Sequence, residues 1–265
     1  MKTIILFFCL FLCVTHYSQN ETVFFSAEHY TKEKCLEEIE KLNKDILQEP
    51  SSTNYYLRGF LKIRTDDFNG ALTDINKAIQ LAPNDYTVFM LRGQLYQQLQ
   101  EYEKAINDFN RCIDLRPKLA APVYFNRAYS KSFLFLNTEA IEDYTQCIAL
   151  DPTNHQAYFN RGILYKNINQ FEKAIHDYSE AIRLKKDFLE AYQNRAIVKS
   201  YMNRKDGMAD FTKVIELDPN NGENYFNRAI YAINMRITFD YCSDLKKAIQ
   251  LHFEEAYDVL NDVCK

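Results

Sequence analysis

Six arginines recur along the chain, and an aspartate follows each of them 15 or 16 residues later. The pairs are Arg58 and Asp74, Arg92 and Asp108, Arg127 and Asp143, Arg161 and Asp177, Arg195 and Asp210, and Arg228 and Asp244. Such residues can form structural ion pairs, or the arginines can form a row that binds a polyanion. Six matched acids would neutralise that row, and a charge near a helix contact is costly unless it is paired. The spacing therefore predicts one structural ion pair in each repeating unit.

The arginines mark an internal repeat of 33 to 35 residues, which extends over about 200 residues. A Gly or Ala follows each arginine, an Ile–Leu pair recurs six times, and prolines 83, 117, 152 and 219 keep the same register. Each unit contains two stretches with the i, i+3, i+4, i+7 apolar spacing of amphipathic helices, such as those around Tyr158 and Phe171. The pattern predicts stacked helical hairpins.

The repeat resembles that of the tetratricopeptide family, whose motif combines an aromatic, a Leu, a Gly, a Tyr, and later Ala, an aromatic, Ala and Pro. The matching small residues are Gly59, Gly93, Ala128, Gly162, Ala196 and Ala229, and the matching helix-contact alanines are Ala71, Ala105, Ala140, Ala174, Ala78, Ala181 and Ala248. The chain departs from the family in two ways: Arg replaces the usual Leu, and Tyr241 replaces the first contact alanine of the last unit.

The resemblance implies an all-α protein, a right-handed α-solenoid of about six helical hairpins with a capping helix at each end. The expected units are about 52–85, 86–120, 121–154, 155–188, 189–221 and 222–255. Residues 19–51 are expected to form an N-terminal segment with a capping helix, and residues 253–265 a C-terminal capping helix. Caps are needed because a terminal hairpin exposes an apolar face.

In this family the first helix of each hairpin lines the concave face, and the residue before each arginine is expected to point inward. Four of these residues are asparagines, whose amides can satisfy both backbone groups of an extended peptide. Aromatic residues beside them would form an apolar groove for alternate side chains of the peptide. The expected peptide-binding residues are Asn126, Asn160, Asn194, Asn227, Phe125, Phe159, Phe226 and Tyr129. The alternative is that the asparagines are inherited scaffold residues of the family.

Some family members hold a C-terminal carboxylate with basic residues on the concave face. None of the corresponding inward positions of this chain is basic: Thr87, Met90, Pro122, Phe125, Gln156, Phe159, Glu190 and Gln193. The resemblance therefore implies that this mode of binding is absent.

Residues 1–18 are typical of an export signal, with Lys2 followed by eleven apolar residues from Ile4 to Val14. Eleven residues are too few to span a bilayer, which takes about 20. Removal of Lys2 changes the net charge from −4 to −5, with 31 basic and 36 acidic side chains. Because no basic run is present, nucleic acid and anionic membranes are not expected partners. We expect an exported protein, periplasmic or secreted, without a membrane span in the mature chain.

Five cysteines follow the predicted signal, so at least one thiol is free or paired with another chain. Cys112 and Cys147 are expected to be buried, Cys242 and Cys264 could join the last hairpin to the terminal helix, and Cys35 is a candidate free thiol. The histidines lack metal-ligand spacing, and the sequence contains no phosphate-binding loop or nucleophile motif. We therefore expect no metal site, no cofactor and no enzyme activity.

These features predict a protein-interaction scaffold whose concave face binds an extended segment of a partner protein. The alternative is a structural protein that self-assembles, or joins an envelope complex, through outer faces or solenoid ends without a peptide in the groove. Oligomers that form without any peptide partner would favour this alternative. The sequence does not identify the partner, because this fold serves many unrelated processes.

Overall fold

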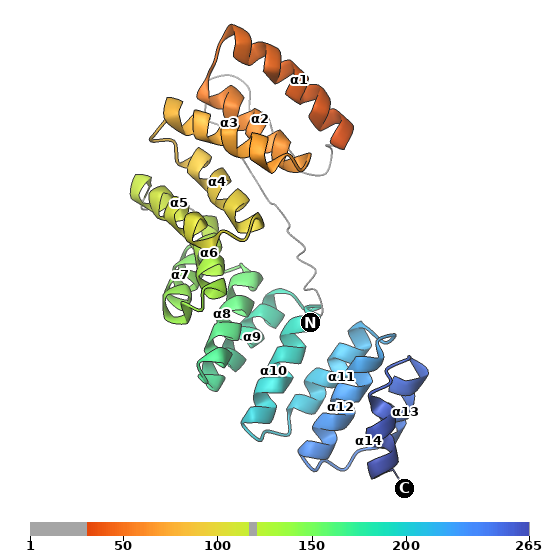
Figure 1. Cartoon of the computed structure of the whole chain (residues 1–265). Coiled ribbons are helices and arrows are strands. Elements are labelled where there is room, and N and C mark those ends of the chain that lie inside the picture. Colours follow the sequence, from red (N-terminus) through yellow and green to blue (C-terminus); the bar gives the residue numbers. More distant parts are fainter. Residues whose placement is uncertain (1–30, 117–120, 265) are drawn as a thin grey trace. The chain divides into compact units, whose positions relative to one another are not determined.

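The computed structural model describes residues 31–116 and 121–264, and within these ranges it contains 14 α-helices and no β-strand. The predicted all-α class is therefore confirmed. The export signal predicted at residues 1–18 lies outside the described residues. Figure 1 shows these helices in their order along the chain. The chain divides between Leu95 and Tyr96 into two compact units.

The described part of the first unit contains three complete helices and most of a fourth. They are α1 (Lys32–Gln48), α2 (Ser52–Arg64), α3 (Phe68–Leu81) and α4 (Tyr86–Gln98), which crosses the boundary between the units. Helix α1 packs against α2, and α2 packs against α3. Cys35, Ile39 and Leu42 of α1 form a buried cluster with Leu61 of α2. Helix α1 thus covers the first hairpin, as expected for the N-terminal cap.

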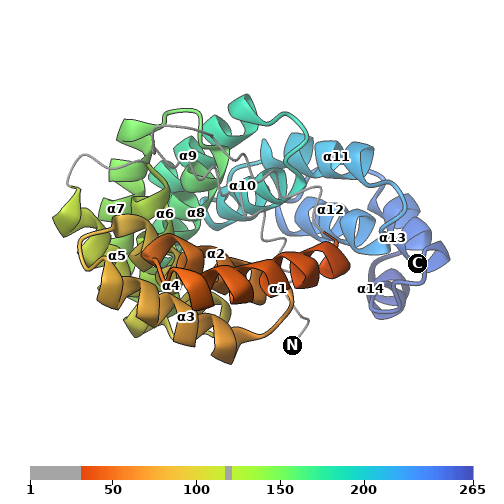
Figure 2. The ribbon, with the colours of Figure 1, turned by 90° about the horizontal axis from the view of Figure 1, so that it is seen from above.

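In its described residues the second unit contains ten helices, each packed against the next one in sequence (Figure 2). They are α5 (Tyr102–Leu115), α6 (Ala121–Phe133), α7 (Asn137–Leu150), α8 (His155–Asn167), α9 (Phe171–Leu184), α10 (Leu189–Tyr201), α11 (Gly207–Leu217), α12 (Gly222–Asn234), α13 (Tyr241–Gln250) and α14 (Ala256–Val263). Helices α6–α7, α8–α9, α10–α11 and α12–α13 are the four hairpins expected between residues 121 and 255. This unit is an α-solenoid of helical hairpins.

The hairpins form because each helix has a stop signal and a small residue where it meets its partner. The turn after each first helix places one residue at positive φ, among them Asp66, Asn169 and Asn203. Polar residues with short side chains tolerate this conformation well. The helix-contact alanines Ala140 and Ala174 are fully buried, which lets the two helices of a hairpin approach closely.

Within the second unit some first helices also approach the first helix of the next hairpin directly. Helix α6 approaches α8, and α8 approaches α10, whereas no comparable contact joins α7 to α9 or α9 to α11 among the described helices. Hairpins that touch at their first helices and splay at their second helices form a stack that curves around the first helices. Helices α6, α8 and α10 therefore line the inner side of this unit.

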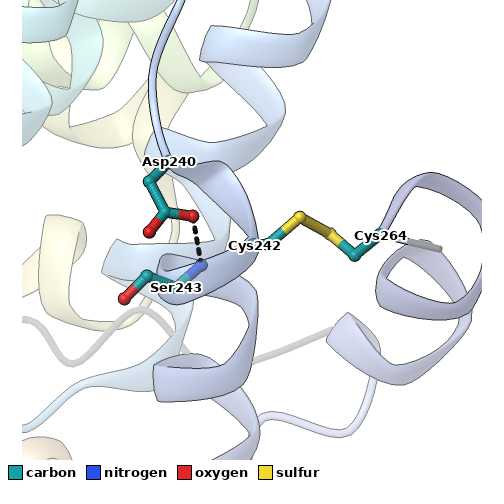
Figure 3. The surroundings of a disulfide bond; sticks show 4 residues. All are labelled: Asp240, Cys242, Ser243 and Cys264. Carbon is teal, nitrogen blue, oxygen red and sulfur yellow. Dashed lines mark hydrogen bonds between the residues drawn. A yellow bond between two sulfur atoms is a disulfide. The ribbon is translucent and has the colours of Figure 1, made fainter.

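The C-terminal helix α14 closes the second unit. Ala256 is buried, and Val259 and Leu260 pack with Phe226 and Phe253 in the last core cluster. A disulfide bond between Cys242 and Cys264, with a Cα–Cα distance of 5.8 Å, fastens the end of α14 to α13 (Figure 3). The other cysteines in the described chain, Cys35, Cys112 and Cys147, are buried and form no disulfide bond there.

Candidate functional site

Five of the six predicted Arg–Asp pairs are present as two-pronged ion pairs. In each, Nε and Nη2 of the arginine donate to the two carboxylate oxygens at 2.5–3.0 Å. The aspartate side chains are only 1–8% exposed, and those of the arginines 13–18%. The sixth pair, Arg92 and Asp108, would join residues of the two units and stays a prediction.

Each of the six arginines also reaches back to the preceding hairpin or cap. Its Nη1 donates to a side-chain oxygen 15 to 17 residues earlier, at 2.7–3.3 Å. The acceptors are Asn43, Asn76, Asn110, Thr145, Ser179 and Thr212. Each of the five arginines with a described aspartate partner therefore joins the two helices of its own hairpin and fastens that hairpin to the preceding element. For Arg58 the earlier element is α1, which takes the place of a second helix.

Aromatic rings and lysines complete this cluster in several hairpins. The guanidinium carbon of Arg161 lies 5.7 Å from the ring centre of Tyr158 and 5.8 Å from that of Tyr165. In other hairpins a lysine, Lys62, Lys131 or Lys199, joins the arginine on the same aspartate. Because all three donor groups of the guanidinium are engaged within the chain, the arginines do not form a row that could bind a polyanion.

The four predicted asparagines lie on α6, α8, α10 and α12, and three of them already make local hydrogen bonds. Nδ2 of Asn126 donates to the Pro122 carbonyl at 2.9 Å, and Nδ2 of Asn160 donates to the Tyr144 hydroxyl at 3.2 Å. Asn194 donates from Nδ2 to the carbonyl of Glu190, also at 2.9 Å. The side chain of Asn227 makes no hydrogen bond within the described part of the chain. Each amide keeps further donor or acceptor capacity, because an amide group can form up to four hydrogen bonds.

The predicted aromatic residues are half-buried and pack against other rings, mostly within their own hairpin. Phe125 meets the Tyr144 ring edge-on at 5.5 Å, and Phe226 lies 5.0 Å from Phe253 of the C-terminal segment. The Phe159 ring lies between Tyr178 and Phe188, and Tyr129 contacts Phe133. These rings therefore form part of the hydrophobic core and are only partly exposed.

One inner-face residue was missed at the sequence level: Lys166 on α8. Its Nζ donates to Oδ1 of Asn194 at 2.9 Å, and burial lowers the pKa of the lysine. Serine occupies the same place in the hairpins before and after, at Ser132 and Ser200. Lys166 is not part of the repeat, because a lysine occupies this position in one hairpin alone. The signal that identifies it is this difference from the other hairpins.

The described residues contain no group of His, Cys, Asp or Glu side chains that could hold a metal ion. Within the same ranges, no helix is long and apolar enough to cross a membrane. The inner face of the second unit, with its amides and half-buried rings, is the candidate binding site.

Models of the tetratricopeptide repeat match residues 57–123, 137–169 and 155–188. The chain belongs to the tetratricopeptide repeat family. Proteins of this family are typically non-catalytic scaffolds, and the fold implies protein partners. No curated protein matches the sequence.

Many solved tetratricopeptide structures have a similar fold. A MamA structure is 24% identical with a TM-score of 0.61 and covers 65% of this chain and 94% of its own. YrrB, described as a TPR protein with an unusual peptide-binding site, is 17% identical with a TM-score of 0.61, over 68% of this chain and 94% of its own. A tetratricopeptide repeat protein from Parabacteroides merdae is 21% identical with a TM-score of 0.61, over 87% of this chain and 92% of its own. At these identities the likeness establishes the fold.

Proposed function

We propose that the second unit binds an extended segment of a partner protein along its first helices α6, α8, α10 and α12. The observation that carries this proposal is the row of asparagines on adjacent first helices. Three of them, Asn126, Asn160 and Asn194, are held by local hydrogen bonds, so their amides are oriented before a ligand arrives. Oriented side chains lose less freedom on binding.

The proposal is tested with a displayed library of random dodecapeptides and the purified protein. We expect wild-type protein to enrich binding sequences, and a variant with Asn160→Ala and Asn194→Ala to lose them. The matched control carries Asn107→Ala and Gln146→Ala, which alter exposed residues of the second helices α5 and α7. Equal enrichment by all three proteins, with helicity retained by circular dichroism, would count against a peptide groove on the inner face.

We also propose that the protein is exported. Two observations support this: the apolar start of the chain and the Cys242–Cys264 disulfide, since disulfide bonds persist in oxidising compartments. Expression of the full-length chain and mass spectrometry of the purified product will test it. Export predicts an N-terminus near residue 19, whereas a product that keeps Met1 and remains in the cytoplasmic fraction contradicts it.

A second candidate function is self-assembly, and one turn of the structure favours it. Phe135, between α6 and α7, has φ 58° and is 85% exposed, and its neighbours Phe133 and Leu136 are also exposed. Polar residues occupy the corresponding place in the other hairpin turns, where Phe is poorly suited to the left-handed conformation. Light scattering after size exclusion tests this function: oligomers that Phe135→Asn converts to monomers would support it, and a wild-type monomer at all concentrations would reject it.

A further inference from the structure

The junction between α13 and α14 is fastened differently from the junctions before it. At each earlier junction, Nη1 of an arginine on a first helix donates to a side-chain oxygen of the preceding second helix or of α1. The repeat places Asp262 of α14, 34 residues after Arg228, where the next arginine would lie. The Cys242–Cys264 disulfide joins α13 to α14 in place of that contact (Figure 3). This junction therefore depends on a bond that a reductant can break, whereas the arginine hydrogen bonds are inert to reduction.

Apart from the disulfide, few contacts hold helix α14. It has eight residues, of which Ala256 alone is buried, while Val259 and Leu260 are partly buried in the last core cluster. No side chain of residues 256–263 makes a hydrogen bond or an ion pair within the described part of the chain. By contrast, the N-terminal cap α1 has 17 residues, four of them buried. A helix as short as α14 is unstable by itself in water, so its position depends on the disulfide.

Both cysteines of this bond are accessible to a reductant. Cys242 and Cys264 are partly exposed, whereas Cys35, Cys112 and Cys147 are buried. Reduction requires that a thiolate reach a sulfur of the bond, and exposed disulfides are among those that are most easily reduced. Among the cysteines of the described chain, this pair is therefore the one open to thiol–disulfide exchange.

Helix α14 covers an apolar surface at the end of the α12–α13 hairpin. Leu245 and Ala248 of α13 belong to the same core cluster as Ala256 of α14, and all three are fully buried. Phe226 and Phe253 are partly buried in this cluster, with their ring centres 5.0 Å apart. The end of a hairpin stack needs such a cover because its apolar face would otherwise meet water. Loss of α14 would therefore expose part of this cluster.

We propose that the Cys242–Cys264 bond is a redox-sensitive fastener, whose reduction by a dithiol detaches α14 and uncovers the apolar end of the α12–α13 hairpin. A thiolate of the reductant attacks one sulfur of the bond and forms a mixed disulfide, and the other cysteine leaves as a thiolate. The second thiolate of the reductant then displaces the first cysteine. Two electrons pass to the protein, the cysteine thiolates take up the two protons that the reductant releases, and the reductant becomes a disulfide. The other hairpins stay folded, because their junctions need no disulfide.

Hydrogen exchange of the purified, oxidised protein tests the proposal, with and without dithiothreitol and in the absence of denaturant. Alkylation followed by mass spectrometry reports whether the bond has been reduced. We expect reduction to speed the exchange of the amides of residues 260–264 by about tenfold or more, because local opening exposes them. Exchange in the α8–α9 hairpin should change by less than about twofold, since that hairpin stays closed.

Two variants separate the role of this bond from other effects of a reductant. The double variant Cys242→Ser with Cys264→Ser should show fast exchange in α14 both with and without dithiothreitol. The matched control is Cys147→Ala, which removes a buried thiol that forms no disulfide bond in the described chain. Alanine fits this place, since the buried Ala181 occupies it in the next hairpin. The control should respond to dithiothreitol as the wild type does.

Three results would overturn the proposal. A bond that dithiothreitol reduces only in denaturant is not accessible in the folded protein. Unchanged exchange of residues 260–264 after reduction would show that packing alone holds α14. An equal rise of exchange in all hairpins would show that the bond supports the whole fold and not the cap.

Discussion

Replacement of Arg161 by Leu should destabilise the second unit by about 3–5 kcal/mol, because it leaves a buried carboxylate without its partner. Asp177 is 1% exposed and loses both hydrogen bonds from Arg161, at 2.7 and 2.8 Å. The position that holds a second cation in other hairpins is Tyr165 here, so no lysine replaces the lost charge. The bond from Nη1 to Thr145 of the preceding hairpin is lost as well. Leucine fits the space, since it is the usual residue of the family at this place.

Urea unfolding followed by circular dichroism at 222 nm measures the effect, with the slope of the transition compared between variants to detect a change of cooperativity. The matched control is Arg183→Leu, which removes an ion pair to Glu180 whose side chains are 59% and 28% exposed. We expect the control to cost at most about 1 kcal/mol. The double variant Arg161→Leu with Asp177→Ala should cost less than the sum of its single changes, because no charge is left stranded. A loss for Arg161→Leu no larger than that of Arg183→Leu would refute the reasoning.

Arg127→Leu should lower the free energy of unfolding clearly less than Arg161→Leu in the same assay, because Lys131 still pairs with Asp143 at 2.7 Å. Equal losses would show that the lysine contributes nothing. Reduction of the Cys242–Cys264 bond, or replacement of both cysteines by Ser, should lower the stability by about 3 kcal/mol, as expected for a closed loop of this size. Hydrogen exchange should then rise first in the C-terminal helix, and uniform exchange would contradict its role as a fastened cap. Phe135→Asn should stabilise the protein by about 0.5–1 kcal/mol, since φ 58° suits Asn better, and a lower Tm would show that the exposed ring packs usefully.

The fold was predictable from the sequence because the same physical requirement recurs in every hairpin. A small residue must lie where two helices touch, and the buried Ala140 and Ala174 mark this contact at the same position of successive hairpins. The ion pairs were predictable for a similar reason. A buried carboxylate such as Asp177 needs a cation at a fixed offset, so Arg161 and its aspartate recur together.

Contacts whose residue types vary were not predictable. The acceptor of the third arginine donor is Asn110 in one hairpin, Thr145 in another and Ser179 in a third, because any small side-chain oxygen at that place serves. A pattern of residue letters hides this equivalence, whereas the geometry reveals it. The Cys242–Cys264 bond likewise depends on how closely two helix ends approach, which spacing alone does not determine.

The candidate site was only partly predictable, because sequence periodicity identifies a shared face and cannot tell which of its residues are committed to the core. Phe159 was expected in the groove, yet its ring lies between Tyr178 and Phe188. The asparagines do lie on the inner helices, but their orientation follows from local bonds such as that between Asn160 and Tyr144. Whether these residues bind a peptide stays a prediction.

The repeated arginines and the single lysine indicate how this chain separates support from recognition. Arg161 uses Nε, Nη1 and Nη2 within the chain, so a ligand could engage it only by breaking contacts that hold two hairpins together. A feature that every hairpin needs cannot distinguish one register of a bound segment from the next. Selectivity for one register must therefore come from residues that differ from the repeat. A residue that differs from the repeat and also lowers the stability of the fold is expected to have a functional role. Lys166 on the first helix α8, a half-buried cation without a described anion, and Tyr178 on the second helix α9, a buried hydroxyl without a described partner, are such residues.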